Sequence, residues 1–192
     1  MNVYDFDKTI FYPDSSVTFC LYCLRRYPRI LFPSMLKGLW GFARTALHLG
    51  TLKQAKEAAF SFLPRMKNTE EVLETYWNEK WDHVQDWYLR QSRPSDLIIS
   101  ASPEFEVRPA ARRLGVRLLA TPMDIHTGKI NGNNCSGEEK VRRFREAFPD
   151  AEVDSFYSDS LRDTPMARLA KKAFLVRKGT LQPWPEKALR DK

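Results

Sequence analysis

Acidic, hydroxyl and basic side chains recur at short spacings in this 192-residue chain, and some of them could act together. The segment DFDKT holds Asp5, Asp7 and Thr9, and the segment SDSLRD holds Asp159 and Asp163. Carboxylates that gather in one place repel each other, and a divalent cation with oxygen ligands relieves that repulsion. We therefore predict a Mg²⁺ site made by these four aspartates, with ordinary acidic turns as the alternative.

A lysine and a serine elsewhere in the chain could serve the same site. Lys140 lies in CSGEEKVRRF, where Ser136 and Glu139 have the S-x-x-E spacing of a capping box at the start of a helix. A cation in the first helical turn opposes the helix dipole, so we expect nearby carboxylates or a bound phosphate to favour it. Ser100 ends the apolar run LIIS and could reach the same place.

Strands must position these residues. The segment NVYDFDKTI has a strand pattern, and beyond Pro94 the runs DLIIS, VRLLA, SFYS and AFLV alternate with helical stretches. This βαβ rhythm predicts an α/β fold with a mainly parallel sheet, whose active site lies at the carboxyl ends of the strands. Residues two apart on a strand share a face, so Asp5, Asp7 and Thr9 should face one site.

Residues 15–91 have a different character. Helical patterns run through this tract with almost no strand signal, and Pro28, Pro33, Gly50 and Pro64 interrupt them. Because the first strand needs the later strands as partners, the helical tract must interrupt the α/β unit. We predict a catalytic core of residues 1–14 and 92–192, with residues 15–91 inserted as an all-helical cap.

The cap also carries the excess positive charge of the chain. Lysines and arginines number 31 against 24 aspartates and glutamates, and residues 15–56 contain no acidic residue. Seven basic residues lie in that segment: Arg25, Arg26, Arg29, Lys37, Arg44, Lys53 and Lys56. They indicate an anionic partner, which could be a substrate phosphate, a lipid headgroup or nucleic acid, unless they form a solvated basic face.

Residues 34–49 form an amphipathic and basic helical pattern. Pro33, Lys37 and Arg44 interrupt any apolar run of the ~20 residues that a transmembrane helix needs. The helix could lie at an anionic membrane surface. We favour a cap helix that buries its apolar face against its neighbours, because amphipathic helices usually face a core.

The segment DFDKT resembles the DxDxT signature of the haloacid dehalogenase-like phosphohydrolases. LIIS, Lys140 and SDSLRD resemble the three remaining motifs of that superfamily in order and rough spacing. The resemblance covers residues 1–14 and about 95–177 and implies a Rossmann-like core. The helical insert looks like the cap of the subfamily IB enzymes, which include phosphoserine phosphatase. The runs LLATPMD, TGKINGNNCSGEEK and YSDSLRDTPM resemble the branch of bacterial phosphatidylglycerophosphate phosphatase-like enzymes.

The resemblance implies catalytic roles for four residues. Asp5 would attack phosphorus and form an aspartyl-phosphate, and Asp7 would protonate the leaving oxygen and later deprotonate the attacking water. Ser100 would donate a hydrogen bond to a phosphoryl oxygen. Lys140 would neutralise the charge of Asp5 and the phosphate.

It also implies a metal site and a substrate site. Asp5, the backbone carbonyl of Asp7, and Asp159 would hold Mg²⁺, and Asp163 would orient Lys140 or a metal-bound water. Thr9 faces the site in our strand prediction, and Asp14 occupies a place where related phosphatases carry an acidic residue near the substrate. Asp14 could equally be a turn residue after Pro13.

These patterns predict a Mg²⁺-dependent phosphomonoester hydrolase acting on a small phosphorylated metabolite. The alternatives are a lipid-phosphate phosphatase at a membrane surface and a non-catalytic phosphate-binding protein. We expect no nucleic-acid partner. Three cysteines and the lack of an apolar leader predict a reduced, cytoplasmic protein, which the surface alternative places at the inner face of the membrane.

Overall fold

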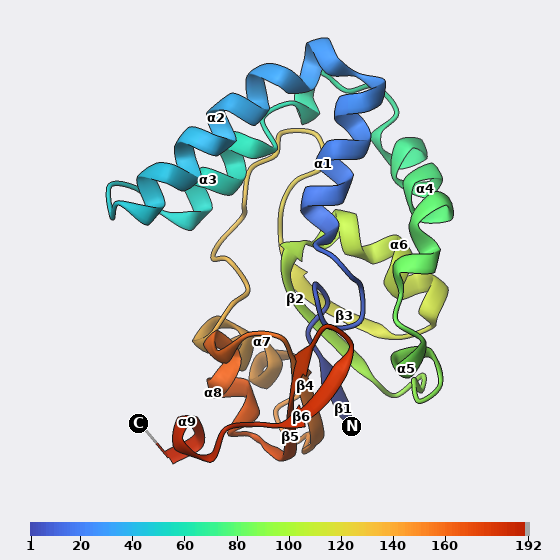
Figure 1. Ribbon diagram of the computed structural model, residues 1–192, viewed down its shortest axis with the longest axis vertical. Coiled ribbons are helices and arrows are strands. Elements are labelled where there is room, and N and C mark those ends of the chain that lie inside the picture. Colours follow the sequence, from blue (N-terminus) through green and yellow to red (C-terminus); the bar gives the residue numbers. More distant parts are fainter. Residues whose placement is uncertain (191–192) are drawn as a thin grey trace.

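The computed structural model describes residues 1–190 and contains one six-stranded sheet with helices around it (Figure 1). Its strands are β1 (Asn2–Tyr4), β2 (Leu97–Pro103), β3 (Arg117–Thr121), β4 (Val153–Ser158), β5 (Ala170–Arg177) and β6 (Thr180–Pro183). The strand order is β3-β2-β1-β4-β5-β6, and β6 alone pairs antiparallel. The predicted α/β fold with a mainly parallel sheet is confirmed.

Helices connect the strands in two groups. Between β1 and β2 lie α1 (Ser15–Arg26), α2 (Pro28–Ala46), α3 (Leu52–Ala59), α4 (Thr69–Lys80) and α5 (Asp86–Leu89). The later helices are α6 (Glu104–Leu114), α7 (Glu138–Ala147), α8 (Thr164–Ala167) and α9 (Glu186–Arg190). Each of α6, α7 and α8 follows one strand of the parallel sheet and precedes the next, as in βαβ units.

Alternate residues of the strands pack on opposite faces of the sheet. On one face Tyr4 pairs in register with Tyr157, and their rings stack with centroids 4.6 Å apart. On the other face Val3 pairs with Leu97 and Phe156. Residues of α6 and of the cap cover the first face, and residues of α7 and α8 cover the second. The central strand β1 is therefore buried on both sides.

β1 ends earlier than the sequence pattern predicts. Beyond Tyr4 the N–H of Phe11 donates to the carbonyl of Phe6 at 3.0 Å, and Lys8 has a φ of 56°. The chain turns back on itself here instead of staying extended. The prediction that DFDKT continues as a strand is wrong.

α2 and α3 form a hairpin that reaches away from the sheet (Figure 1). Gly38 and Gly41 of α2 face Ala59 and Ala55 of α3, and a Cβ on either glycine would lie 2.9 Å from an alanine Cα. Small residues on both helices thus let the two backbones approach closely.

α2 buries only a narrow stripe, made by Leu31, Ser34 and Gly38. Seven large apolar side chains of α2 and the turn after it are 43% to 68% exposed: Phe32, Leu36, Leu39, Trp40, Phe42, Leu47 and Leu49. We call these seven residues the apolar surface of α2. The prediction that this helix buries its apolar face is wrong. α2 contacts mainly α3 and α1, and these contacts leave most of its large apolar side chains exposed. Within residues 1–190, no helix is both long and apolar enough to cross a membrane.

One hydrophobic cluster joins the sheet to the second half of the insert. Trp77 of α4 packs edge-on against Phe6 and Phe11, with centroids 5.8 and 5.2 Å away. Tyr88 of α5 packs edge-on against Tyr4 at 4.9 Å. The division of the chain at residues 14/15 and 91/92 therefore stays a prediction.

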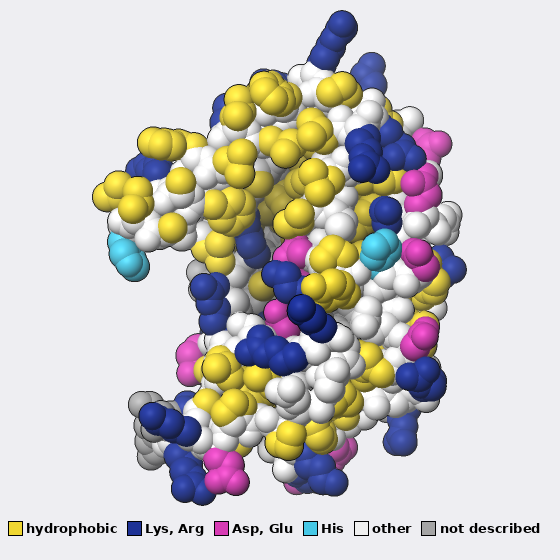
Figure 2. All heavy atoms as spheres, in the orientation of Figure 1, with side chains coloured by type: hydrophobic (Ala, Val, Ile, Leu, Met, Phe, Trp, Pro, Cys, Tyr) yellow, Lys and Arg dark blue, Asp and Glu magenta, His cyan; other side chains and the backbone are white. Residues whose placement is uncertain are grey.

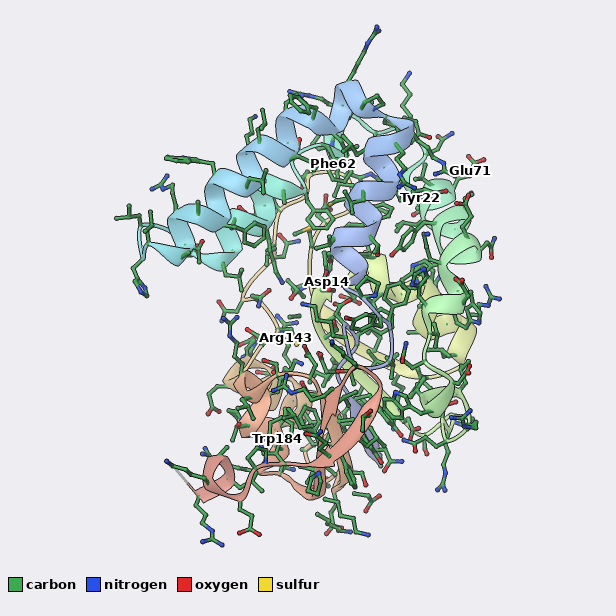
Figure 3. All side chains as sticks on the ribbon, in the orientation of Figure 1. Asp14, Tyr22, Phe62, Glu71, Arg143 and Trp184 are labelled. Atoms are coloured by element: carbon green, nitrogen blue, oxygen red, sulfur yellow. The ribbon has the colours of Figure 1, made fainter. Side chains whose placement is uncertain are left out.

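The C-terminal segment completes the edge of the sheet. β6 returns antiparallel to β5, which the sequence did not indicate. Trp184, marked in Figure 3, follows β6 and is 4% exposed, and its ring lies 5.9 Å from that of Phe156. The segment thus covers one end of the core.

Candidate active site

Asp5, Lys140 and Asp163 meet at the carboxyl ends of the central strands. Asp5 directly follows β1, and its N–H donates to the carbonyl of Tyr157 in β4 at 2.8 Å. Lys140 lies in the first turn of α7, as predicted. Asp163 ends the short 3₁₀ helix Leu161–Asp163 that follows β4. We call these three residues the ion-pair triad.

Two short ion pairs hold the triad together. Lys140 Nζ donates to Asp5 Oδ1 and to Asp163 Oδ2, each at 2.6 Å, and the Lys140 side chain is 1% exposed. Burial by itself lowers the pKa of Lys140, but the two carboxylates outweigh it, so its pKa lies above the ordinary value. Burial raises the pKa of Asp5 to about 7, although Lys140 lowers it. The Lys140 ammonium therefore stays charged, and it favours the ionised form of Asp5, which burial alone would disfavour.

Asp7 is held by a different set of donors. The N–H of Ser15, the first residue of α1, donates to Asp7 Oδ1 at 2.6 Å, and the Ser102 hydroxyl donates to Asp7 Oδ2. Burial and the nearby Asp14 carboxylate raise the pKa of Asp7 to about 6. A carboxyl group that titrates near neutral pH is suited to general acid–base catalysis.

Asp159 is half-buried and lines the same pocket as Asp5 and Asp7. Burial raises its pKa, and no donor from residues 1–190 bonds to its carboxylate. The donor set of Asp5, Asp159 and the Asp7 carbonyl fits Mg²⁺, which typically takes one or two carboxylates with water and phosphate oxygens. Asp163 is already bonded within the triad, and residues 1–190 contain no group of three or more Asp, Glu, His or Cys side chains spaced to hold a metal alone.

The remaining predicted residues lie around this centre. Thr9 is fully buried, and its hydroxyl accepts the N–H of Asp159 at 3.0 Å. Ser100 is 1% exposed and accepts the N–H of Ser102 at 3.0 Å, so its contact with phosphate stays a prediction. Asp14 lines the pocket and also caps the N-terminus of α1, which agrees with the turn alternative.

These side chains open into a pocket of about 510 Å³ between the sheet and the cap. Its floor holds the triad, Asp7 and Asp159. Its upper wall is apolar and includes Val17, Leu21, Met35, Leu39, Phe42 and Phe60. Figure 2 shows a hollow with acidic and basic side chains inside it, below a surface of hydrophobic side chains over α2. Asp14, marked in Figure 3, lies between the two at the start of α1.

Residues 3–168 match the sequence profile of the haloacid dehalogenase-like hydrolases. The chain belongs to this hydrolase family. The family predicted from DFDKT, LIIS, Lys140 and SDSLRD is confirmed, and with it a hydrolase. The narrower branch within the family stays a prediction.

The individual proteins that resemble this hydrolase share between 15% and 37% of aligned residues with it. Over 91 residues the chain is 37% identical to Protein CicA of Caulobacter vibrioides, a match that covers 43% of this chain and 41% of that protein. The fold is similar to that of a protein of unknown function from Bordetella pertussis, with a TM-score of 0.73, 21% identity, and 90% and 87% of the two chains covered. A phosphoserine phosphohydrolase-like protein from Francisella tularensis has a TM-score of 0.55 and 15% identity, with 90% and 86% covered.

Two residues of the hydrolase site were not predicted. Ser102 bonds to Asp7, and its position two residues after Ser100 was the only signal for it. Lys56 of α3 enters the pocket from the cap and donates to the Ala101 carbonyl at 2.7 Å and to Asn134 Oδ1 at 2.6 Å. Burial lowers the pKa of Lys56. The sequence identified Lys56 only as one of seven basic residues in the predicted cap.

Two further details lie near the triad. Ser158 donates its hydroxyl to Asp163 Oδ2 at 2.8 Å and supports the triad. The predicted capping box does not form. Gly137 is the N-cap of α7, and the Glu139 carboxylate pairs with Arg142 and Arg143 one turn later.

Proposed function

We propose that this hydrolase cleaves phosphomonoesters with Mg²⁺ through an aspartyl-phosphate on Asp5. The observation that carries the proposal is the Lys140 ammonium, fixed 2.6 Å from the Asp5 carboxylate in the floor of an open pocket. Attack of a carboxylate on a phosphate dianion is opposed by charge repulsion, and a fixed cation lowers that barrier. Phosphoserine phosphatases among the solved structures of this fold support the same substrate class.

The residues divide the reaction between them. Asp5 forms a bond to phosphorus as the bond from phosphorus to the leaving oxygen breaks, and Asp7 gives that oxygen a proton. Asp7 then takes a proton from the water that attacks phosphorus and frees Asp5. Lys140 stays beside Asp5 throughout, and Asp163 holds Lys140. Mg²⁺ bound by Asp5, the Asp7 carbonyl and Asp159 would supply positive charge beside the phosphate.

Hydrolysis of an aryl phosphate tests this proposal. We expect turnover with Mg²⁺, loss of turnover in excess chelator, recovery when Mg²⁺ is restored, and poor replacement by Ca²⁺, whose coordination is looser. Asp5→Asn should abolish turnover, because an amide does not attack phosphorus. Asp154→Asn, which changes an exposed carboxylate paired with the N-terminal amine, is the matched control and should be fully active. Full activity in chelator or in Asp5→Asn would contradict the proposal.

A second candidate function is hydrolysis of a lipid phosphate at an anionic membrane surface. The apolar surface of α2 supports it, because Leu39 and Phe42 are part of both this surface and the pocket wall. A substrate with an apolar tail could therefore pass from a bilayer into the pocket with little exposure to water. Exposed cations of α2, Lys37 and Arg44, lie on the same helix and suit anionic headgroups.

Sedimentation with anionic vesicles tests this second candidate. We expect binding at low salt that weakens at high salt, because exposed charges are screened. Changing Lys37 and Arg44 to glutamine should weaken binding about 30-fold at ~1 kcal/mol for each charge, and leave aryl phosphate turnover unchanged. The control changes Lys187 and Arg190 of α9, at the opposite end of the molecule (Figure 1), and should bind like the wild type. A protein that stays in the supernatant at low salt would remove this candidate and leave the first intact.

A further inference from the structure

Glu106 of α6 is a buried carboxyl group with few partners. Its side chain is fully buried, and no lysine, arginine or histidine within residues 1–190 forms an ion pair with it. Oε2 bonds to the Ser16 hydroxyl at 3.0 Å, and Oε1 has no hydrogen-bond partner. A buried, unpaired carboxylate is strongly disfavoured, so the neutral acid is the stable form here. Burial, with a further contribution from Asp7, raises the pKa of Glu106 well above its ordinary value.

A chain of hydrogen bonds leads from Glu106 to Asp7. The Ser16 hydroxyl lies 3.0 Å from Glu106 Oε2 and 3.2 Å from the Ser102 hydroxyl, which in turn bonds to Asp7 Oδ2. The chain joins the cap to the core, because Ser16 belongs to α1 and Ser102 to β2. All contacts are between oxygen atoms, so each needs one proton between its two atoms.

Counting protons fixes the direction of the chain. Three oxygen–oxygen contacts need three protons, and the two serine hydroxyls supply two. If both carboxyl groups were ionised, Ser102 would donate to Asp7, Ser16 would donate to Glu106, and no proton would remain between the serines. A proton on Glu106 completes the chain. Because the Ser102 hydroxyl donates to Asp7 Oδ2, it must accept from Ser16, and Ser16 must then accept from Glu106, so the donors run from Glu106 toward Asp7.

We propose that Glu106 is a positioning residue that, as a neutral donor acting through Ser16 and Ser102, fixes the carboxyl group of Asp7 toward the leaving oxygen of the substrate. This inference rests on the proposed phosphomonoester hydrolysis. Without Glu106 the chain no longer holds Ser16, and through it Ser102, in the orientation that donates to Asp7 Oδ2, so the carboxyl group can rotate away from the substrate. Misplacement of a reacting group by about 1 Å can lower a rate by about 100-fold.

The experiment compares two substrates with different leaving groups. An alkyl alkoxide needs a proton from Asp7 as it leaves, whereas the anion of an activated aryl phosphate does not. We expect Glu106→Met to lower kcat/KM for an alkyl phosphate by about 10- to 100-fold and to change kcat/KM for the aryl phosphate much less. Glu106→Gln keeps a donor for Ser16 and should restore the alkyl phosphate to near the wild-type value. Glu104→Met, on the same helix but outside the pocket, is the control and should leave both substrates unchanged.

A purely structural role would give a different result. It would lower kcat/KM for both substrates by the same factor, and that outcome would overturn the proposal, as would wild-type values for folded Glu106→Met. If Glu106→Met does not fold, Ser16→Ala breaks the chain at a half-buried position and should give the same selective loss. The double variant Glu106→Met with Ser102→Ala should have a kcat/KM for the alkyl phosphate no lower than that of the less active single variant, because both changes break the same chain. If the wild type hydrolyses neither ester with Mg²⁺, the proposed function itself fails.

Discussion

The floor and the upper wall of the pocket are built in opposite ways. In the floor, the ammonium of Lys140 lies 2.6 Å from each of two buried carboxylates, and Ser158 supplies a further donor to one of them. In the upper wall, α2 leaves its large apolar side chains exposed and touches the rest of the protein along one stripe. The floor must hold charges in fixed positions for the reaction. The upper wall has no such requirement, so substrate preference can change there without disturbing the chemistry.

The largest expected effect comes from removing the cation of the floor. Lys140→Met leaves Asp5 and Asp163 buried and unpaired, so the free energy of unfolding should fall by about 3–5 kcal/mol and turnover by about 1,000-fold. Lys129→Met, which breaks an exposed 3.3 Å pair with Glu57, should cost less than about 1 kcal/mol. Urea denaturation and aryl phosphate turnover measure both. Equal losses in the two variants would contradict the contrast between floor and surface.

A smaller effect is expected where the cap meets the core. A Cβ on Gly128, whose φ is 69°, would lie 2.5 Å from the Phe60 carbonyl oxygen at the end of α3. Gly128→Ala should lower the free energy of unfolding by about 2–3 kcal/mol, since backbone must move as well as adopt a disfavoured φ. Gly115 has a φ of 68° and open space around it, so Gly115→Ala isolates the conformational cost of about 1 kcal/mol. Equal losses of unfolding free energy in the two variants would mean that the close contact between Gly128 and Phe60 adds no cost.

The buried acid behind the floor should make stability depend on pH. Glu106 titrates near about 4.3 in the unfolded chain and at higher pH in the folded protein, so above that value folding takes up a proton. The free energy of unfolding should therefore fall as pH rises, by up to about 1.4 kcal/mol per pH unit from this group, until the folded protein also releases the proton. Glu106→Gln does not titrate, so its stability relative to the wild type should increase as the pH rises above about 4.3, the value for the unfolded chain. Parallel stability curves for the two proteins would show that Glu106 is ionised in the fold.

The smallest effect should come from the apolar surface of α2, outside the pocket. Trp40 is 68% exposed, so Trp40→Ala should change the free energy of unfolding by less than about 0.5 kcal/mol. The buried Trp77 serves as the comparison. It is 2% exposed, and its indole N–H donates to the backbone carbonyl of Glu106 at 2.8 Å. Trp77→Ala should lower the free energy of unfolding by about 3–5 kcal/mol. A large loss for Trp40→Ala would mean that the apolar surface of α2 is covered in solution.

The sequence predicted the sheet and the floor better than the upper wall. The alternation of apolar runs and helices identifies a parallel sheet, and strand ends bring Asp5 and Asp163 to one edge wherever such a sheet forms. Periodicity shows that a helix has an apolar face but not what covers it, so the exposure of Trp40 could not be read from the sequence. Ser16 and Ser102 meet only because cap and core dock in one particular way. The length of β1 was overestimated because NVYDFDKTI contains β-branched and aromatic residues, although local contacts between Phe6 and Phe11 turn the chain.

The position of β1 in the middle of the sheet has a consequence for biosynthesis. Asp5 depends on Tyr157 of β4 for its backbone hydrogen bond, and on Lys140 and Asp163 for its ion-pair triad. The ribosome releases Asp5 long before any of these partners, and closing such a long loop is a slow step in folding. Chains that stop short of β4 lack the sheet partner and part of the triad. Asp5 therefore reaches its final surroundings only at the end of synthesis, when the sheet closes around it.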